Sequence, residues 1–295
     1  MPLPVIVGAA DAPSAVAAVD WAADEAALRG TRLHLVHAWQ WEPGETPTPT
    51  TATPTTAAST PVAAEVEQGG ERLLDELVRR ARSRQAELEI SSETADSSAR
   101  DALNGLSGQA QVLVVGARGR GGFPALLIGS TSLYLAARAA CPVVVVPDGG
   151  GEPVGGVTVG LHGQEPNDEV LSFAFETCLR RRLPLRAVHT WSYPLIRLSG
   201  RLAPPVYERG HVEAEQARLV AELLAGWREK YPQVPVEEDI VRAGPAKHLV
   251  TLSEHQQLLV VGRHGTPEGP VGRLGSVSQA VVQHARCPVA VIPVG

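Results

Sequence analysis

The chain has 295 residues, of which 44% are hydrophobic and 20% charged, a composition typical of globular proteins rather than of disordered or fibrous ones. Its 26 Lys and Arg residues against 32 Asp and Glu residues give a net charge of −6, which lacks the basic footprint of a general nucleic-acid-binding protein. Three cysteines are too few for a disulfide framework, and no apolar stretch approaches the roughly 18 residues of a membrane helix. The N-terminal MPLPVIVG has no basic flank and is typical of a strand rather than of a signal peptide. We therefore expect a soluble, cytoplasmic protein without nucleic-acid or membrane partners.

An internal repeat predicts the domain organisation. LVVGARG from Leu113 recurs as LVVGRHG from Leu259, 146 residues later, whereas IVGAAD from Ile6 recurs as TVGLHG from Thr158, 152 residues later. The first copy is thus longer by six residues, which we place in the segment rich in Thr, Pro and Ala at about 42–61, a predicted surface loop. We expect two domains, 1–148 and 153–295, joined by a short connector rich in Gly and Pro.

In chain order, each copy alternates apolar strands with helical patterns. The first copy predicts strands at 4–10, 33–38, 88–94, 111–115 and 142–146, and helices at 12–30, about 65–84, 97–106 and from 130 onward. The second copy repeats this order, with strands near Val157, Leu185, Val236, Leu258 and Val289. Such alternation predicts an α/β fold in which a doubly wound, five-stranded parallel sheet occurs twice.

A glycine-rich loop after the fourth strand is the feature most suggestive of ligand binding. It reads GARGRGGFPALLIGSTS from Gly116 to Ser132, and a helix opens at its end. Glycines permit close approach of a ligand, and the helix N-terminus with Arg118 favours an anion such as a polyphosphate. A P-loop is excluded because Gly122 and Phe123 stand where Lys and Ser or Thr are required, and a dinucleotide fingerprint is excluded by Pro124. That the loop is only a strand-to-helix turn stays open as an alternative.

The same spacing occurs in both copies: Gly116, Gly119, Gly129 and Ser130 in the first, and Gly262, Gly265, Gly275 and Ser276 in the second. With the terminal CPVVVV and CPVAVI strands, this pattern resembles the universal stress protein family in its tandem form. The resemblance implies flavodoxin-like domains that form an internal pseudo-dimer, a homodimer of chains, and, in one subclass, binding of ATP with or without Mg²⁺. It implies cofactor contacts at Gly8, Ala9, Ala10, Ala38, Val115, Gly116, Arg118, Gly119, Gly129, Ser130, Thr131 and Ser132, and at Gly262, His264, Gly265, Gly275, Ser276 and Val277.

The chain departs from the family at the end of the first strand of each copy. Ala10 and His162 stand where the family usually carries an Asp that contacts adenosine, and Pro267 and Glu268 replace two loop glycines in the second copy. We therefore rank the first site above the second. No pattern of catalytic or metal-ligating residues stands out. The sequence favours a non-catalytic, ATP-binding stress-response or regulatory protein; a nucleotide-free scaffold or interaction module is the alternative, and slow ATPase activity stays open.

Overall fold

The computed structural model describes residues 2–39, 60–118, 128–149, 155–163, 168–192, 196–198, 201–203, 211–263 and 274–294. The chain divides into two compact units, Met1–Gly149 and Gly150–Gly295.

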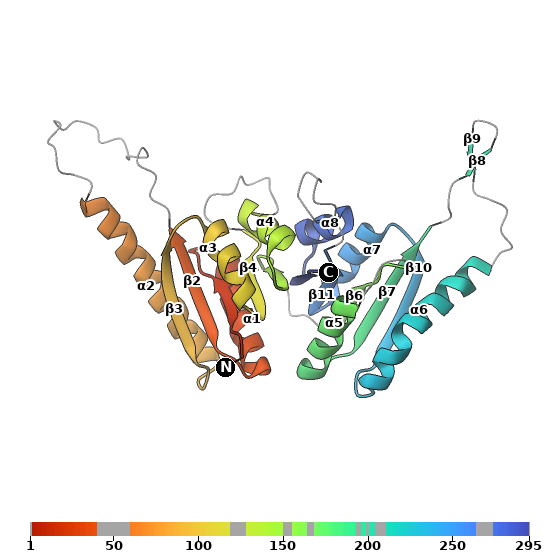
Figure 1. The fold of residues 1–295 in the computed structure, drawn as a ribbon, viewed down its shortest axis with the longest axis horizontal. Helices are drawn as coiled ribbons and strands as arrows, with labels where there is room; N and C mark the ends of the chain where they lie inside the picture. Colours follow the sequence, from red (N-terminus) through yellow and green to blue (C-terminus); the bar gives the residue numbers. More distant parts are fainter. Residues whose placement is uncertain are drawn as a thin grey trace. The chain divides into compact units, whose positions relative to one another are not determined.

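The first unit is a five-stranded parallel sheet in the order β3-β2-β1-β4-β5. Figure 1 shows β3, β2 and β4 of this sheet, with α2 packed beside β3. Its elements in chain order are β1 (Val5–Gly8), α1 (Pro13–Arg29), β2 (Leu33–Trp39), α2 (Thr60–Arg84), β3 (Ile90–Asp96), α3 (Ala99–Leu106), a short 3₁₀ turn (Ser107–Gln109), β4 (Val112–Gly116), α4 (Ser130–Arg138) and β5 (Val143–Val146). Helices α1 and α2 pack together on the sheet, and α3 packs with α4.

The second unit repeats this plan with the order β10-β7-β6-β11-β12. Its elements are β6 (Val157–Gly160), α5 (Asp168–Arg181), β7 (Leu185–Trp191), β8 (Ile196–Leu198), β9 (Arg201–Ala203), α6 (His211–Lys230), β10 (Val236–Arg242), α7 (Pro245–Leu252), a 3₁₀ turn (Ser253–His255), β11 (Leu258–Gly262), α8 (Ser276–His284) and β12 (Val289–Ile292). The doubly wound, five-stranded parallel sheet predicted for each copy is confirmed.

Strands β4 and β5 of the first unit, and β11 and β12 of the second, lie in the core because both of their faces are covered. Every residue of β4, β5, β11 and β12 is buried, and their sequences are continuous apolar runs, mostly of Val and Leu, rather than alternating patterns. A fully buried side chain of this size contributes about 1.5–3 kcal/mol to folding. The outer strands β3 and β10 carry polar residues and are mostly half-buried or exposed, which is how edge strands resist pairing with other chains.

Two bidentate ion pairs tie α2 to α1 on the solvent side. Arg80 donates two hydrogen bonds to Asp20, at 2.7 and 2.6 Å, and Arg84 donates two to Asp24, at 2.8 and 2.7 Å. Hydrogen bonding to the carboxylates raises the pKa of both guanidinium groups. Because all four side chains are partly exposed to solvent, these pairs orient the helix more than they stabilise it.

The structure differs from the sequence-based expectation at two places. Helix α2 begins at Thr60, so Thr60 and Pro61 are helical although we expected them in the loop; Pro is well tolerated in a first helical turn because its missing N–H has no partner there. The remainder of the expected loop, 42–59, lies outside the described residues. The antiparallel pair β8–β9, in which Ile196 pairs with Ala203, has no counterpart in the expectation.

Cys141, Cys178 and Cys287 are buried, and none of them is part of a disulfide. Burial raises the pKa of Cys178 and of Cys287 to about 12, so both are neutral thiols near pH 7. Among the helices that the structure describes, none is long and apolar enough to span a membrane.

Candidate functional site

The carboxyl ends of β1 and β4 lie side by side at the point where the strand order of the first unit reverses. The chain proceeds from β1 outward to β2 and β3, then returns to the other side of β1 with β4. Ligands of doubly wound sheets bind at this edge. Gly8 ends β1, Val115 and Gly116 end β4, and Ala38 is the penultimate residue of β2. The fold therefore brings the expected strand-end residues of the first copy to one edge.

Gly116 is a glycine because α1 passes directly over it. A Cβ atom here would lie 2.6 Å from the backbone carbon of Ser14 and 2.7 Å from the backbone nitrogen of Ala15. Ser14 is fully buried, and its hydroxyl donates to the Arg118 carbonyl at 2.7 Å and accepts from the Arg118 N–H at 3.1 Å. Helix α1 thus fixes the first residues of the glycine loop, a contact that the sequence reasoning missed.

The N-terminus of α4 closes the same edge. Gly129 is the N-cap, and its N–H donates to the Ala117 carbonyl at 2.6 Å. Ser132 is buried, and its hydroxyl donates to the Gly116 carbonyl at 2.7 Å, so this side chain ties the helix to the strand. Ser130 is exposed and Thr131 is half-buried. Their side chains and the first N–H groups of the helix form the polar surface open to an anion.

Arg118 adds positive charge beside this helix end. Its Nε lies 3.8 Å from Oδ2 of Asp148, a residue that follows β5, and both side chains are more than a third exposed. An exposed pair at this distance is weak, which leaves Arg118 able to turn toward a phosphate. Gly119 and residues 120–127 lie outside the described part of the chain.

In the second unit the structure contains a cavity of about 360 Å³ at the equivalent edge. The ends of β6, β7 and β11 and the start of α8 form it, together with the first turns of α7. The described cofactor candidates of this copy, Gly262, Gly275, Ser276 and Val277, all line the cavity, as do His162 and Thr190. Ser278, equivalent to Ser132, again donates to a strand-end carbonyl, that of Gly262, at 2.6 Å. His264 and Gly265 lie outside the described residues.

The volume of this cavity falls within the range of about 300–1,000 Å³ that is usual for small-molecule sites. Its lining combines apolar side chains such as Leu249 and Val261 with hydroxyls, imidazoles and the N-terminus of α8. This combination suits a ligand with an apolar or aromatic part and an anionic part.

A larger cavity, of about 480 Å³, opens at the opposite edge of the first unit. The turn after α1, at 30–32, and the turn after α2, at 85–89, supply most of its lining. It lies away from the carboxyl ends of the strands, where ligands of this sheet type bind, so we assign no ligand to it.

His37, near the end of β2, shows how closely α2 approaches the site of the first unit. Its Nδ1–H donates to the Ala9 carbonyl at 2.9 Å, while its ring packs against Gly70 of α2. A Cβ atom at Gly70 would lie 2.7 Å from Cδ2 of His37, whereas a Cβ atom at the neighbouring Gly69 would meet nothing within 4 Å.

This pair of glycines provides a matched test. Gly69→Ala should stabilise the chain by about 0.5–1 kcal/mol, since Ala is favoured over Gly inside a helix. Gly70→Ala has the same advantage in helix propensity, but its Cβ atom must displace the His37 ring. Its free energy of unfolding should therefore be about 1–2 kcal/mol below that of Gly69→Ala. Urea denaturation of the two variants measures the difference, and equal stabilities would show that the ring moves aside freely.

Comparison with known proteins places this arrangement in a family. The model of the universal stress protein family matches residues 1–147 and again 156–293. The chain belongs to the universal stress protein family. It is 36% identical over 298 residues to a universal stress protein of Mycobacterium tuberculosis strain H37Rv, with 98% of this chain and 96% of the relative covered. A universal stress protein of Mycobacterium bovis is 34% identical over 300 residues, with 97% and 96% covered.

One solved structure has the same fold over nearly the whole length of this chain. The crystal structure of a universal stress protein from Archaeoglobus fulgidus superposes with a TM-score of 0.69 at 16% identity, covering 99% of this chain and 96% of that one. The family resemblance and the tandem arrangement predicted from the repeat are confirmed by the two matches of the family model and by the 36% identical relative. At this identity the structural likeness supports the fold alone.

Proposed function

We propose that the protein is a non-catalytic, adenine-nucleotide-binding protein of the stress-response or regulatory type, which holds ATP at the carboxyl edge of each sheet. The observation that carries the proposal is the cavity of the second unit, where Gly275 and Ser276 open α8 beside the end of β11. Gly129 and Ser130 open α4 in the same way beside β4. A helix N-terminus at a switch point is suited to the phosphates of a nucleotide.

The residues of the first site fit the same ligand. Ser130, Thr131 and Arg118 would contact the phosphates, while Gly8–Ala10 and Ala38 would border the nucleoside. ATP, with Mg²⁺ if the metal accompanies it, would supply the regulatory signal by being bound or released. We rank this site as the tighter of the two because the loop keeps its glycines and carries Arg118, whereas the loop of the second copy carries Pro267 and Glu268.

The proposal of a non-catalytic protein rests on the sequence pattern. Hydrolysis of ATP requires a group that orients water and usually a metal held at the phosphates, and no motif of the sequence supplies a residue for either role. A nucleotide-free scaffold of the same fold is the competing function, and the homodimer implied by the family resemblance is tested by light scattering against the chain mass of 31.1 kDa.

The direct test is chromatography of the small molecules released when freshly purified protein is denatured, followed by calorimetric titration of the emptied protein with ATP and MgCl₂. We expect adenine nucleotide in the released fraction, at one equivalent per chain if only the first site is filled and at two if both are. Absence of nucleotide after denaturation and absence of heat on titration would together favour the scaffold.

A further inference from the structure

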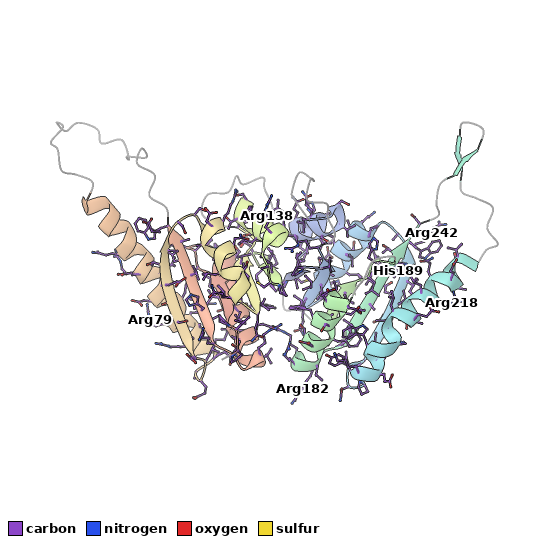
Figure 2. The ribbon with its side chains drawn as sticks, viewed as in Figure 1. Arg79, Arg138, Arg182, His189, Arg218 and Arg242 are labelled. Carbon is purple, nitrogen blue, oxygen red and sulfur yellow. The ribbon has the colours of Figure 1, made fainter. Side chains whose placement is uncertain are left out.

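The second strand of each copy ends in a short repeated sequence, HAW at 37–39 and HTW at 189–191. The two units differ in how the histidine of this sequence is held. His189 lies toward the carboxyl end of β7 and is the counterpart of His37 in the repeat; it is labelled in Figure 2. It is 5% exposed and lines the cavity of the second unit. Its ring is therefore within reach of a ligand in that cavity.

The ring is held from the side of α6. Its Nε2 lies 2.8 Å from Oε1 of Gln216, whose repeat counterpart in the first unit is Gly70. In the orientation that the structure gives the Gln216 amide, its oxygen faces the ring; in the tautomer that fits this contact Nε2 donates, and Nδ1 is the acceptor nitrogen of the ring. In the first unit the corresponding Nδ1 carries the hydrogen and donates to Ala9. The two rings therefore present opposite hydrogen-bonding character at Nδ1.

Nδ1 of His189 is buried and has no hydrogen-bond partner within the described part of the chain. Buried polar atoms without a partner are rare, and each costs about 1–3 kcal/mol. Beside the ring, Gly163 stands where the first unit has Asp11, and a Cβ atom at Gly163 would lie 2.9 Å from Cε1 of His189. Because glycine has no side chain, no Cβ atom lies against Cε1 of the ring at this position, and Gly163 and His189 both line the cavity.

We propose that His189 is a specificity-determining residue of the second site, where Nδ1 accepts a hydrogen bond from an N–H or O–H group of the nucleoside part of the ligand. The inference rests on the proposed function, because it assumes that the second site takes a nucleotide. It adds that the second site selects its ligand through a side-chain acceptor that the first site does not present. Gln216 is the positioning residue that fixes the ring.

The test uses the full chain carrying Ser130→Asp, which introduces a negative charge at the first site and leaves the second site unchanged. Calorimetry measures the affinity for ATP and for three triphosphates that each lack one donor: the 2′-deoxy, the 3′-deoxy and the purine riboside analogues. We expect one analogue to bind about tenfold more weakly than ATP, since the loss of one donor leaves the buried acceptor unpaired. Equal affinity for all four ligands would overturn the proposal.

Two substitutions then separate recognition from packing. His189→Asn keeps an acceptor near the position of Nδ1 and should retain the discrimination, whereas His189→Gln keeps a polar group only toward Gln216 and should lose it. His37→Gln, the control in the first unit, should leave the discrimination intact. Melting temperatures show that each variant is folded, and Gln216→Leu, which frees the ring, replaces His189→Gln if that variant does not fold.

The outcomes distinguish the two hypotheses. If ATP binds to the second site but His189→Gln and Gln216→Leu keep the same preference among the four triphosphates, the role proposed for His189 is wrong and the proposed function stands. If the second site binds none of the triphosphates, the proposed function fails at this site and the role of His189 fails with it.

Discussion

Replacing both helix-opening serines by aspartate, in the double variant Ser130→Asp with Ser276→Asp, should weaken ATP binding roughly tenfold to thirtyfold at each site while leaving the chain at least as stable. Ser130 is the exposed first residue of α4, and Ser276 is the exposed first residue of α8. A carboxylate at a helix N-terminus is favoured by about 0.3–1 kcal/mol, so the melting temperature should not fall. The same carboxylate would occupy the position where phosphates bind.

The expected loss of affinity follows from the repulsion between like charges. Two unit charges 4 Å apart interact by about 4 kcal/mol at an effective dielectric constant of 20. A repulsion of only a third to a half of this energy would weaken ATP binding by roughly tenfold to thirtyfold per site. Titration calorimetry with ATP and MgCl₂ measures the effect, and each single variant reports which of the two sites is the tighter.

Ser130→Asn with Ser276→Asn is the matched control, because asparagine has the shape of aspartate without its charge. This variant should bind ATP within about threefold of the natural chain. Adenosine, which has no phosphates, should bind the aspartate and asparagine variants alike. ATP binding that is unchanged in the aspartate variant would show that the phosphates do not lie at the helix N-termini, and the proposed site would have to be abandoned.

The repeat and the apolar runs were sufficient to predict the fold. Strands such as Val143–Val146 are buried on both faces, so continuous Val runs identify them without knowledge of their neighbours. The start of α2 was misplaced because Pro61 belongs to a Thr- and Pro-rich segment by composition but lies in the first turn of a helix in the structure. Composition describes a segment as a whole and cannot locate the residue at which a helix begins.

The candidate site could be predicted where its parts adjoin in the sequence. The start of α4 at Gly129 and Ser130 was predicted because glycine, serine and the start of a helix follow one another. Ser14 was missed because its contact with Arg118 spans 104 residues, and a serine after proline gives no other signal than a helix start. The partnership of His189 with Gln216 was missed for the same reason, although a comparison of the two copies could have found it: glycine at 70 becomes glutamine, and aspartate at 11 becomes glycine.

Gly116→Ala should destabilise the first unit severely. The added Cβ atom would lie within 2.7 Å of two backbone atoms of α1 and of the Ser14 hydroxyl. A helix backbone cannot give way as a side chain can, so α1 must move away from β4. Overpacking of this kind costs about 1–3 kcal/mol, and we expect the upper end, since the substitution would also disturb the hydrogen bonds between Ser14 and Arg118.

Gly8→Ala and Gly105→Ala complete a graded series within the same unit. A Cβ atom at Gly8 would lie 3.0 Å from Cδ1 of Leu103, a side-chain methyl group that can rotate, while one at Gly105 would meet nothing within 4 Å. Urea denaturation should rank the variants with Gly116→Ala least stable, Gly8→Ala intermediate and Gly105→Ala at or above the natural chain. A stable Gly116→Ala variant would mean that α1 is not held against β4, and that the glycine at this position serves the ligand rather than the packing of α1.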